Sequence, residues 1–124
     1  GKLVASASWD KTVKVWSTET TAEVSTLHGQ GTVSSVAFSG DGKLVASASW
    51  DKTVKVWSTE AWAEVSTLHG HKERVKIVAF SGDGKLLASA PEGRTVEVWS
   101  TETWAKVSSL HGQGTVSSVA FSGD

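Results

Sequence analysis

The chain consists of one segment repeated three times. Residues 1–17 read GKLVASASWDKTVKVWS, residues 42–58 repeat this segment unchanged, and residues 84–100 carry the altered version GKLLASAPEGRTVEVWS. The repeats therefore start 41 and then 42 residues apart. A period in the low forties that holds several short strands is typical of propeller blades, which bury their apolar faces by stacking on one another. We divide the chain into three repeats, residues 1–41, 42–83 and 84–124.

Each repeat contains four strand signals. In the first repeat, residues 2–8 form an apolar run of small side chains, and residues 12–16 are rich in β-branched side chains and follow an Asp-Lys turn. Residues 23–27 are more polar, and residues 33–38 are again apolar. No segment shows the apolar spacing of a helix over ten residues. The sequence predicts an all-β fold of four-stranded antiparallel sheets.

The polarity of these strands predicts their order. The runs 2–8 and 33–38 are apolar on both faces, as expected for strands covered by a neighbouring sheet on each side. The run 23–27 carries charged and polar residues, which suit an exposed edge. We expect antiparallel meanders with 33–38 innermost and 23–27 outermost, arranged around an axis as β-propeller blades.

The composition argues against several classes of function. The formal net charge of −1 predicts no basic surface for nucleic acid or an anionic membrane, and no run approaches the ~18 apolar residues of a membrane span. The absence of Cys excludes disulfides and thiolate metal sites. The equivalent residues His28, His69 and His111 should lie at least a sheet spacing apart, too far to share one zinc ion. We expect no metal and no cofactor, and without a targeting signal the location of the protein stays open.

An enzyme is not expected either. No Ser stands in a G-x-S-x-G context, and the carboxylates are scattered over turns and strand edges. The sequence Gly40-Asp41-Gly42 is a hairpin turn rather than a phosphate cradle, because no basic residue is placed for a phosphate.

The pattern LHGH…VAFSGDGKLLAS…TVEVW resembles the WD-repeat β-propeller family, and the resemblance covers the whole chain three times over. Family blades carry Gly-His before the innermost strand, Asp in a later turn, and Trp-Asp at the end of the following strand. The matching residues are His71 after Gly70, Asp10 and Asp51 in the turns, and Trp16, Trp57 and Trp99, each followed here by Ser. The resemblance gives these residues structural roles and implies a rigid scaffold that binds proteins or peptides.

The resemblance also implies a hydrogen-bonded network that joins the His, the turn Asp, a strand Ser and the Trp. No blade of this chain keeps both ends of that network: Gly93 stands where His71 needs its Asp, and Gln stands where the blades of Asp10 and Asp51 need their His. A buried polar network stabilises a fold only when its members are satisfied. We therefore expect packing to replace the network and His71→Ala to behave as an ordinary exposed substitution, costing under ~1 kcal/mol.

Other tryptophans are candidates for partner contacts. Trp9 and Trp50 precede the turn Asp, and the resemblance places this position on the face that contacts partners; exposed aromatic residues are common in binding hot spots. Alternatively, both cover the turn and pack on the adjacent blade. Trp62 and Trp104 lie where the family usually has Gly, and Thr21 takes this place in the first repeat. If they lie at the periphery of the blades, these two tryptophans indicate a contact surface, and they imply no catalytic chemistry.

Three blades cannot close into a ring alone. With sheets ~10 Å and strands ~4.8 Å apart, three blades would have a mid-blade radius of ~5 Å and overlapping inner strands. We expect the strand 116–121 of one chain to pair with 2–8 of the next, through an interface formed by Lys2, Leu3, Val4, Ala5, Val116, Val119 and Phe121. Six blades would be crowded at a radius of ~9.5 Å, whereas nine give ~14 Å. Because the inner phenylalanines need room, we favour a cyclic homotrimer over a dimer.

Two functions remain open. The first is a self-assembling structural scaffold, engineered or idealised from a WD-repeat parent, since residues 1–19 recur at 42–60 and residues 28–41 recur at 111–124. The second is a natural interaction module that binds a protein or peptide ligand through Trp9 and Trp50. Varied loops would favour the second function. The repeats barely vary, which favours the first.

Overall fold

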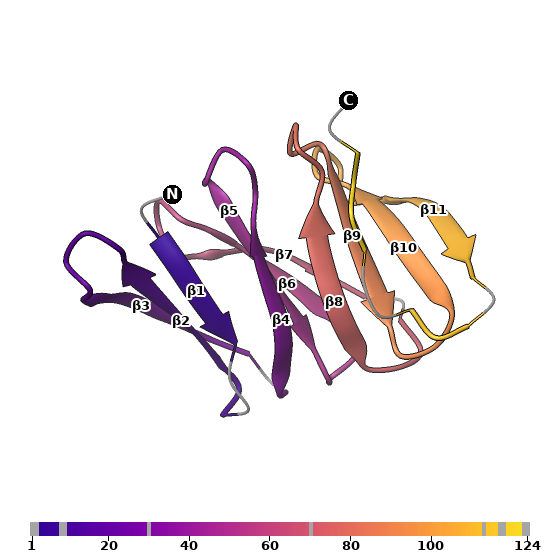
Figure 1. The fold of residues 1–124 in the computed structure, drawn as a ribbon, viewed down its shortest axis with the longest axis horizontal. Coiled ribbons are helices and arrows are strands. Elements are labelled where there is room, and N and C mark those ends of the chain that lie inside the picture. Colours follow the sequence, from indigo (N-terminus) through magenta and orange to yellow (C-terminus); the bar gives the residue numbers. More distant parts are fainter. Residues whose placement is uncertain are drawn as a thin grey trace.

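The computed structural model describes residues 3–7, 10–29, 31–69, 71–112, 114–116 and 119–122. In these residues the chain forms eleven β-strands and no helix (Figure 1). The strands are β1 (Leu3–Ala7), β2 (Thr12–Ser17), β3 (Glu23–His28), β4 (Val33–Phe38), β5 (Leu44–Ser49), β6 (Val54–Ser58), β7 (Glu64–Leu68), β8 (Val75–Phe80), β9 (Leu86–Pro91), β10 (Thr95–Ser100) and β11 (Lys106–His111). The all-β prediction is confirmed.

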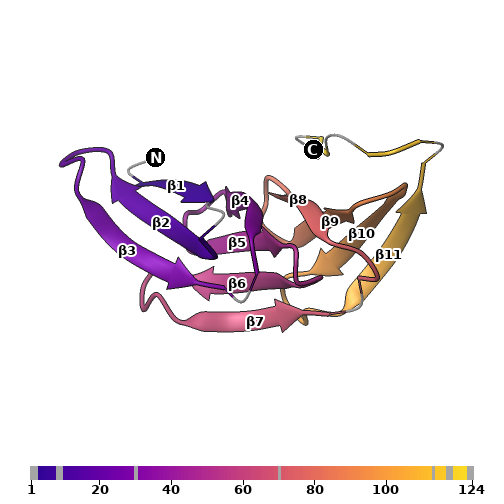
Figure 2. The same cartoon turned by 90° about the horizontal axis from the view of Figure 1, so that it is seen from below.

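The strands form three antiparallel meanders, which we call blades 1, 2 and 3. Their strand orders are β1-β2-β3, β4-β5-β6-β7 and β8-β9-β10-β11. The blades stand side by side in chain order, with β1, β4 and β8 along one side of the molecule and β3, β7 and β11 along the other (Figure 2). The predicted strand order is therefore confirmed. Blades 2 and 3 have four strands, whereas blade 1 lacks an innermost strand in the described residues.

Local hydrogen bonds explain the turn after β5. The backbone N–H of Thr53 donates to Asp51 Oδ1 over 3.1 Å, and Lys52 between them has a positive φ of 77°. Asp10, Lys11 and Thr12 form the same turn in blade 1. Since Asp bonds the backbone two residues ahead, it stabilises a tight turn locally, and in blade 2 the Trp50 N–H also donates to the Thr32 carbonyl over 2.9 Å.

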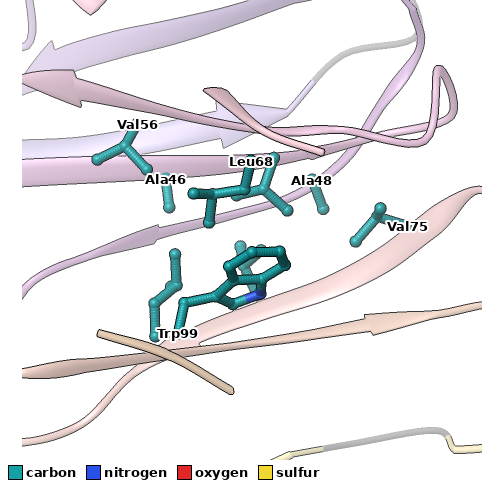
Figure 3. Packing of buried hydrophobic residues seen from close by; sticks show 9 residues of the cluster. Ala46, Ala48, Val56, Leu68, Val75 and Trp99 are labelled. Carbon is teal, nitrogen blue, oxygen red and sulfur yellow. The ribbon is translucent and has the colours of Figure 1, made fainter. Parts of the chain in front are cut away.

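Two apolar clusters hold the blades together. The first joins blades 2 and 3 through Ala46, Ala48, Val54, Val56, Leu68, Val75, Val78, Leu87 and Trp99 (Figure 3). The second joins blades 1 and 2 through Val13, Val15, Leu27, Val33, Val45 and Trp57. Because side chains alternate across a strand, blade 2 contributes one face to each cluster. The core therefore lies between blades rather than within any one of them.

The strand predicted at 116–121 is not formed in the described part of that segment. Val116 and residues 119–121 lie outside any strand, and residues 117 and 118 lie outside the described residues. The Val116 N–H donates to the Gly93 carbonyl over 3.0 Å, and Val116, Val119 and Phe121 are half-buried. The physical reason is that a strand needs a hydrogen-bonding neighbour. The partner predicted for this segment belongs to another copy of the chain.

Candidate functional site

Each blade has two different apolar faces. The leading face points toward the next blade in the chain, and in blade 2 it consists of Ala46, Ala48, Val54, Val56 and Leu68. The trailing face points toward the previous blade, and in blade 2 it consists of Val33, Val45 and Trp57 with the partly buried Val36, Phe38 and Trp62. Both interfaces in the chain pack a leading face against a trailing face.

The leading face of blade 3 is open. It has the same residue types as that of blade 2, at Ala88, Ala90, Val96, Val98 and Leu110. Leu110 is 53% exposed, whereas its equivalents Leu27 and Leu68 are each 3% exposed. Ala88 and Ala90 are buried at the inner part of this face, and the C-terminal segment runs beside blade 3 (Figure 1). The outer half of the face is thus an uncovered apolar surface.

The trailing face of blade 1 is open as well. Val4 is 51% exposed, whereas the equivalent Val45 is 1% exposed and Leu87 is fully buried. Trp16 is half-buried, whereas its equivalents in blades 2 and 3 are buried. The two ends of the blade stack therefore carry complementary surfaces, one leading and one trailing.

Of the interface residues predicted on β1, Val4 lies on the open trailing face, whereas Leu3 and Ala5 pack against the closed cluster between blades 1 and 2. Val4 is exposed, and Leu3 and Ala5 are half-buried on β1. Lys2 lies outside the described residues. Within one chain β1 belongs to blade 1, whereas Val116 bonds to Gly93 of blade 3, so pairing between these two segments stays a prediction about two copies of the chain.

A cluster around Trp50 spans blades 2 and 3. The Arg74 guanidinium carbon lies 4.3 Å from the centroid of the Trp50 ring, within the range of a cation–π interaction. The same guanidinium makes a bidentate ion pair with Glu92, with its shortest N–O distance at 2.9 Å. Trp50 is half-buried, and its ring stacks on Arg74 of the neighbouring blade; its predicted role in partner binding stays a prediction. Trp9 lies outside the described residues.

His71 belongs to a buried network. Its Nε2 lies 2.7 Å from Ser89 Oγ, and the same hydroxyl accepts a hydrogen bond from Trp99 Nε1 over 2.8 Å. The rings of His71 and Trp99 meet edge to face at 6.0 Å. Since His71 is only 8% exposed, burial lowers its pKa below the ordinary 6.5; nearby Glu97 opposes this shift and Lys106 adds to it.

This network corrects the expectation that packing replaces it and that His71 is exposed. Loss of the turn Asp removes one member, but the Ser89 hydroxyl still bonds to His71 and still accepts the indole N–H of Trp99. The sequence-based expectation required both the His and the turn Asp to be present. It did not consider that Ser89 and Trp99, which the repeat also contains, can form the network with the His alone.

A pocket of about 420 Å³ opens beside His71. It is lined by His71, Lys72, Glu73, Pro91, Glu92, Arg94, Thr95, Glu97, Lys106 and His111. Burial alone would raise the pKa of Glu97, but the Lys106 ammonium at 2.7 Å and the Ser109 hydroxyl outweigh it, and the net pKa lies below the ordinary 4.5. The Glu97 carboxylate in the pocket is thus already paired with an ammonium group. In the described residues no group of three or more potential metal ligands comes together.

Trp62 and Trp104 pack against the clusters between blades. Trp62 joins the cluster of blades 1 and 2, and Trp104 joins that of blades 2 and 3. Both have a positive φ, 54° and 60°, and so does Thr21 at 58°. This backbone conformation favours Gly, which explains why Gly is usual at this turn. The expected contact surface at the periphery is thus an internal contact between blades.

Comparisons with known proteins identify a matching family model and a similar solved structure. The family model described as "WD domain, G-beta repeat" matches residues 1–17, 21–58 and 62–100. The solved structure titled "Structure of U3-55K" superposes with a TM-score of 0.86 at 26% identity, covering 92% of this chain and 37% of that one. No curated protein sequence matches the chain. In the described residues no helix is long and apolar enough to cross a membrane.

Proposed function

Because the chain belongs to the WD-repeat family of β-propeller scaffold and interaction modules, we propose that it is a self-assembling scaffold whose copies join head to tail into a closed ring. The chain spans about a third of the length of the solved structure it matches, so its blades amount to part of a propeller. In this proposal the leading face of blade 3 packs on the trailing face of blade 1 of the next copy.

One observation carries the proposal: the open faces repeat the closed ones. The same Leu position is 3% exposed where a blade follows and 53% exposed where none does. The same Val position changes from 1% to 51%. Burial of apolar area is the main favourable term in association. The contact proposed between copies would bury the same kind of surface that the two contacts between blades bury within the chain.

The C-terminal segment supports the proposal through its pattern. In blade 2, β4 pairs with β5 so that Phe38 faces Val45. The equivalent pairing between copies places Phe121 opposite Val4 and supplies the strand that blade 1 lacks. It also covers the unpaired edge of β1, and exposed edges of this kind are an aggregation hazard.

We propose a ring of three copies, on the estimate that nine blades leave the inner strands room and six crowd them. The verbatim repetition of residues 1–19 at 42–60 supports an idealised or engineered origin. A head-to-tail contact between identical chains gives a closed assembly only when the rotation between neighbours completes a circle, and three chains with cyclic symmetry meet this condition. No catalytic step is part of this proposal.

The test is the solution mass, measured by light scattering and native mass spectrometry. We expect three times 13.0 kDa. A mass of twice 13.0 kDa would replace the trimer by a six-bladed dimer, and a single-chain mass at all concentrations would reject the ring. Adjoining repeats of a longer chain would then be the better candidates to cover the open faces.

Matched variants separate assembly from folding. Val4→Glu puts a charge on an exposed residue of the proposed interface and should break the ring without unfolding the chain. Val24→Glu places the same charge on an exposed residue of the outermost strand β3 and should leave the ring intact. Dissociation by both variants alike would indicate a non-specific effect of charge.

A second candidate function is partner binding through the surface of Trp50, Arg74 and Glu92. It is supported by an aromatic ring and an ion pair that stay partly exposed on one edge of the blades. The three groups already satisfy one another, however, because the guanidinium both stacks on the ring and pairs with the carboxylate. This favours a structural role for the three residues, and the closed ring of chains remains our proposal.

A further inference from the structure

The open trailing face of blade 1 differs from the closed ones in one large side chain. In blades 2 and 3 the turn between the two outer strands carries Trp62 and Trp104, which pack against the two apolar clusters. In blade 1 the equivalent residue is Thr21, which is exposed. At the other trailing positions the residues are the same or similar. The face that would meet another copy therefore lacks one aromatic contact.

Backbone geometry does not require this difference. Thr21 has a φ of 58°, between the values of 54° and 60° for Trp62 and Trp104. The hydrogen bonds of the turn are also the same, because the N–H of residue 21 and that of residue 104 donate to the Ser carbonyl four residues earlier, at 2.9 and 2.8 Å. A Trp would thus fit the turn of blade 1, and the choice of Thr affects only what the side chain can contact.

We infer that Thr21 determines the strength of the contact between copies and makes it weaker than the two contacts within the chain. This inference rests on the proposed ring. A Trp is the largest apolar side chain and supplies much of the energy at interfaces that contain it. Without it, the contact between copies buries less apolar surface than its internal counterparts. The ring should accordingly dissociate into folded single chains before the blades separate.

Thr21→Trp tests the inference in the full chain. The dissociation constant of the ring, measured by sedimentation or mass photometry over a dilution series, should fall at least tenfold per contact, or about 1.4 kcal/mol. The effect should accumulate over the ring, because each copy adds one such contact. Thr20→Trp is the control, since this position is exposed in all three repeats and adds the same side chain outside the interface.

The outcomes separate the inference from the proposed function. Rings from both proteins with dissociation constants within twofold would overturn the inference and leave the ring standing. Single-chain masses for both proteins at all concentrations would overturn the ring and the inference together. An equal gain from Thr20→Trp would also overturn the inference, because it would show general adhesion rather than a specific contact. A ring that forms only with Thr21→Trp at low concentration would support both.

Discussion

The indole N–H of Trp99 donates a hydrogen bond to the Ser89 hydroxyl over 2.8 Å. In blade 2 the equivalent indole N–H of Trp57 is buried and finds no partner in the described part of the structure. The equivalent Ser47 is also buried. The two blades differ in sequence at the position of His71, where the repeat of blade 2 has Gln30. Blade 2 also keeps Asp51 where blade 3 has Gly93, so the satisfied Trp99 belongs to the blade that has the His and lacks the Asp.

Removal of this imidazole should destabilise the chain. In His71→Ala the Ser89 hydroxyl loses a buried partner, and leaving a buried polar group unsatisfied costs ~1–3 kcal/mol. Urea unfolding followed by tryptophan fluorescence measures the change in the free energy of unfolding. The control is His69→Ala, at an exposed position, which should change it by under ~0.5 kcal/mol. Equal effects of the two substitutions would contradict a structural role of the network.

The reverse substitution should stabilise blade 2. Gln30→His puts an imidazole at the position that His71 has in blade 3, and blade 2 retains the turn residue Asp51. A satisfied network that includes the indole of Trp57 should add ~0.5–1.5 kcal/mol to the free energy of unfolding. In the background of Trp57→Phe, which has no N–H, this gain should shrink. A gain of the same size in both backgrounds would mean that the His acts elsewhere.

Local signals were sufficient to predict the strands and turns from the sequence. Alternating apolar residues and a self-bonding Asp act within a few residues, and Asp51 forms the predicted turn. The strand at 116–121 is different because a strand depends on a neighbour, and its described residues are irregular without one. A sequence pattern indicates that a segment can form a strand. It does not supply the pairing partner.

Contacts between blades were harder to predict. Trp62 lies at a turn where a large apolar residue is unusual, and only the position of the preceding blade shows that its ring is covered. The burial of His71 likewise depends on residues 18 and 28 positions away, Ser89 and Trp99. The open faces follow from the repeat itself. Their exposure, however, needs the structure, because identical residue types are buried in one blade and exposed in another.

Acidification should destabilise blade 3 through His71. Because burial lowers the pKa of His71 below 6.5, the unfolded chain binds the proton first, and stability falls as the pH drops below about 6.5. Carboxylates with lowered pKa, such as Asp41 and Asp83, lose their contribution only near and below their ordinary 3.8. Urea unfolding at pH 7.5 and 5.5 separates the two effects. In His71→Gln the loss over this interval should be smaller, because Gln does not titrate, and an unchanged loss would assign it to other groups.

The equivalent residues Trp16 and Trp57 should respond differently to the same substitution. Trp57 is buried between blades 1 and 2, so Trp57→Ala should cost ~3–5 kcal/mol as a large-to-small change in the core. Trp16 is half-buried on the open trailing face, so Trp16→Ala should cost clearly less in the isolated chain. Urea unfolding at dilutions where single chains predominate measures both values.

At concentrations where the oligomeric ring forms, Trp16→Ala should instead raise the dissociation constant of that ring. The reason is that the proposed contact between copies buries the Trp16 indole, as the internal contacts bury the indoles of Trp57 and Trp99. The two measurements together test the equivalence of open and closed faces. Equal losses of stability in dilute single chains would contradict the open face of blade 1. An unchanged dissociation constant for Trp16→Ala would show that copies do not meet through this face.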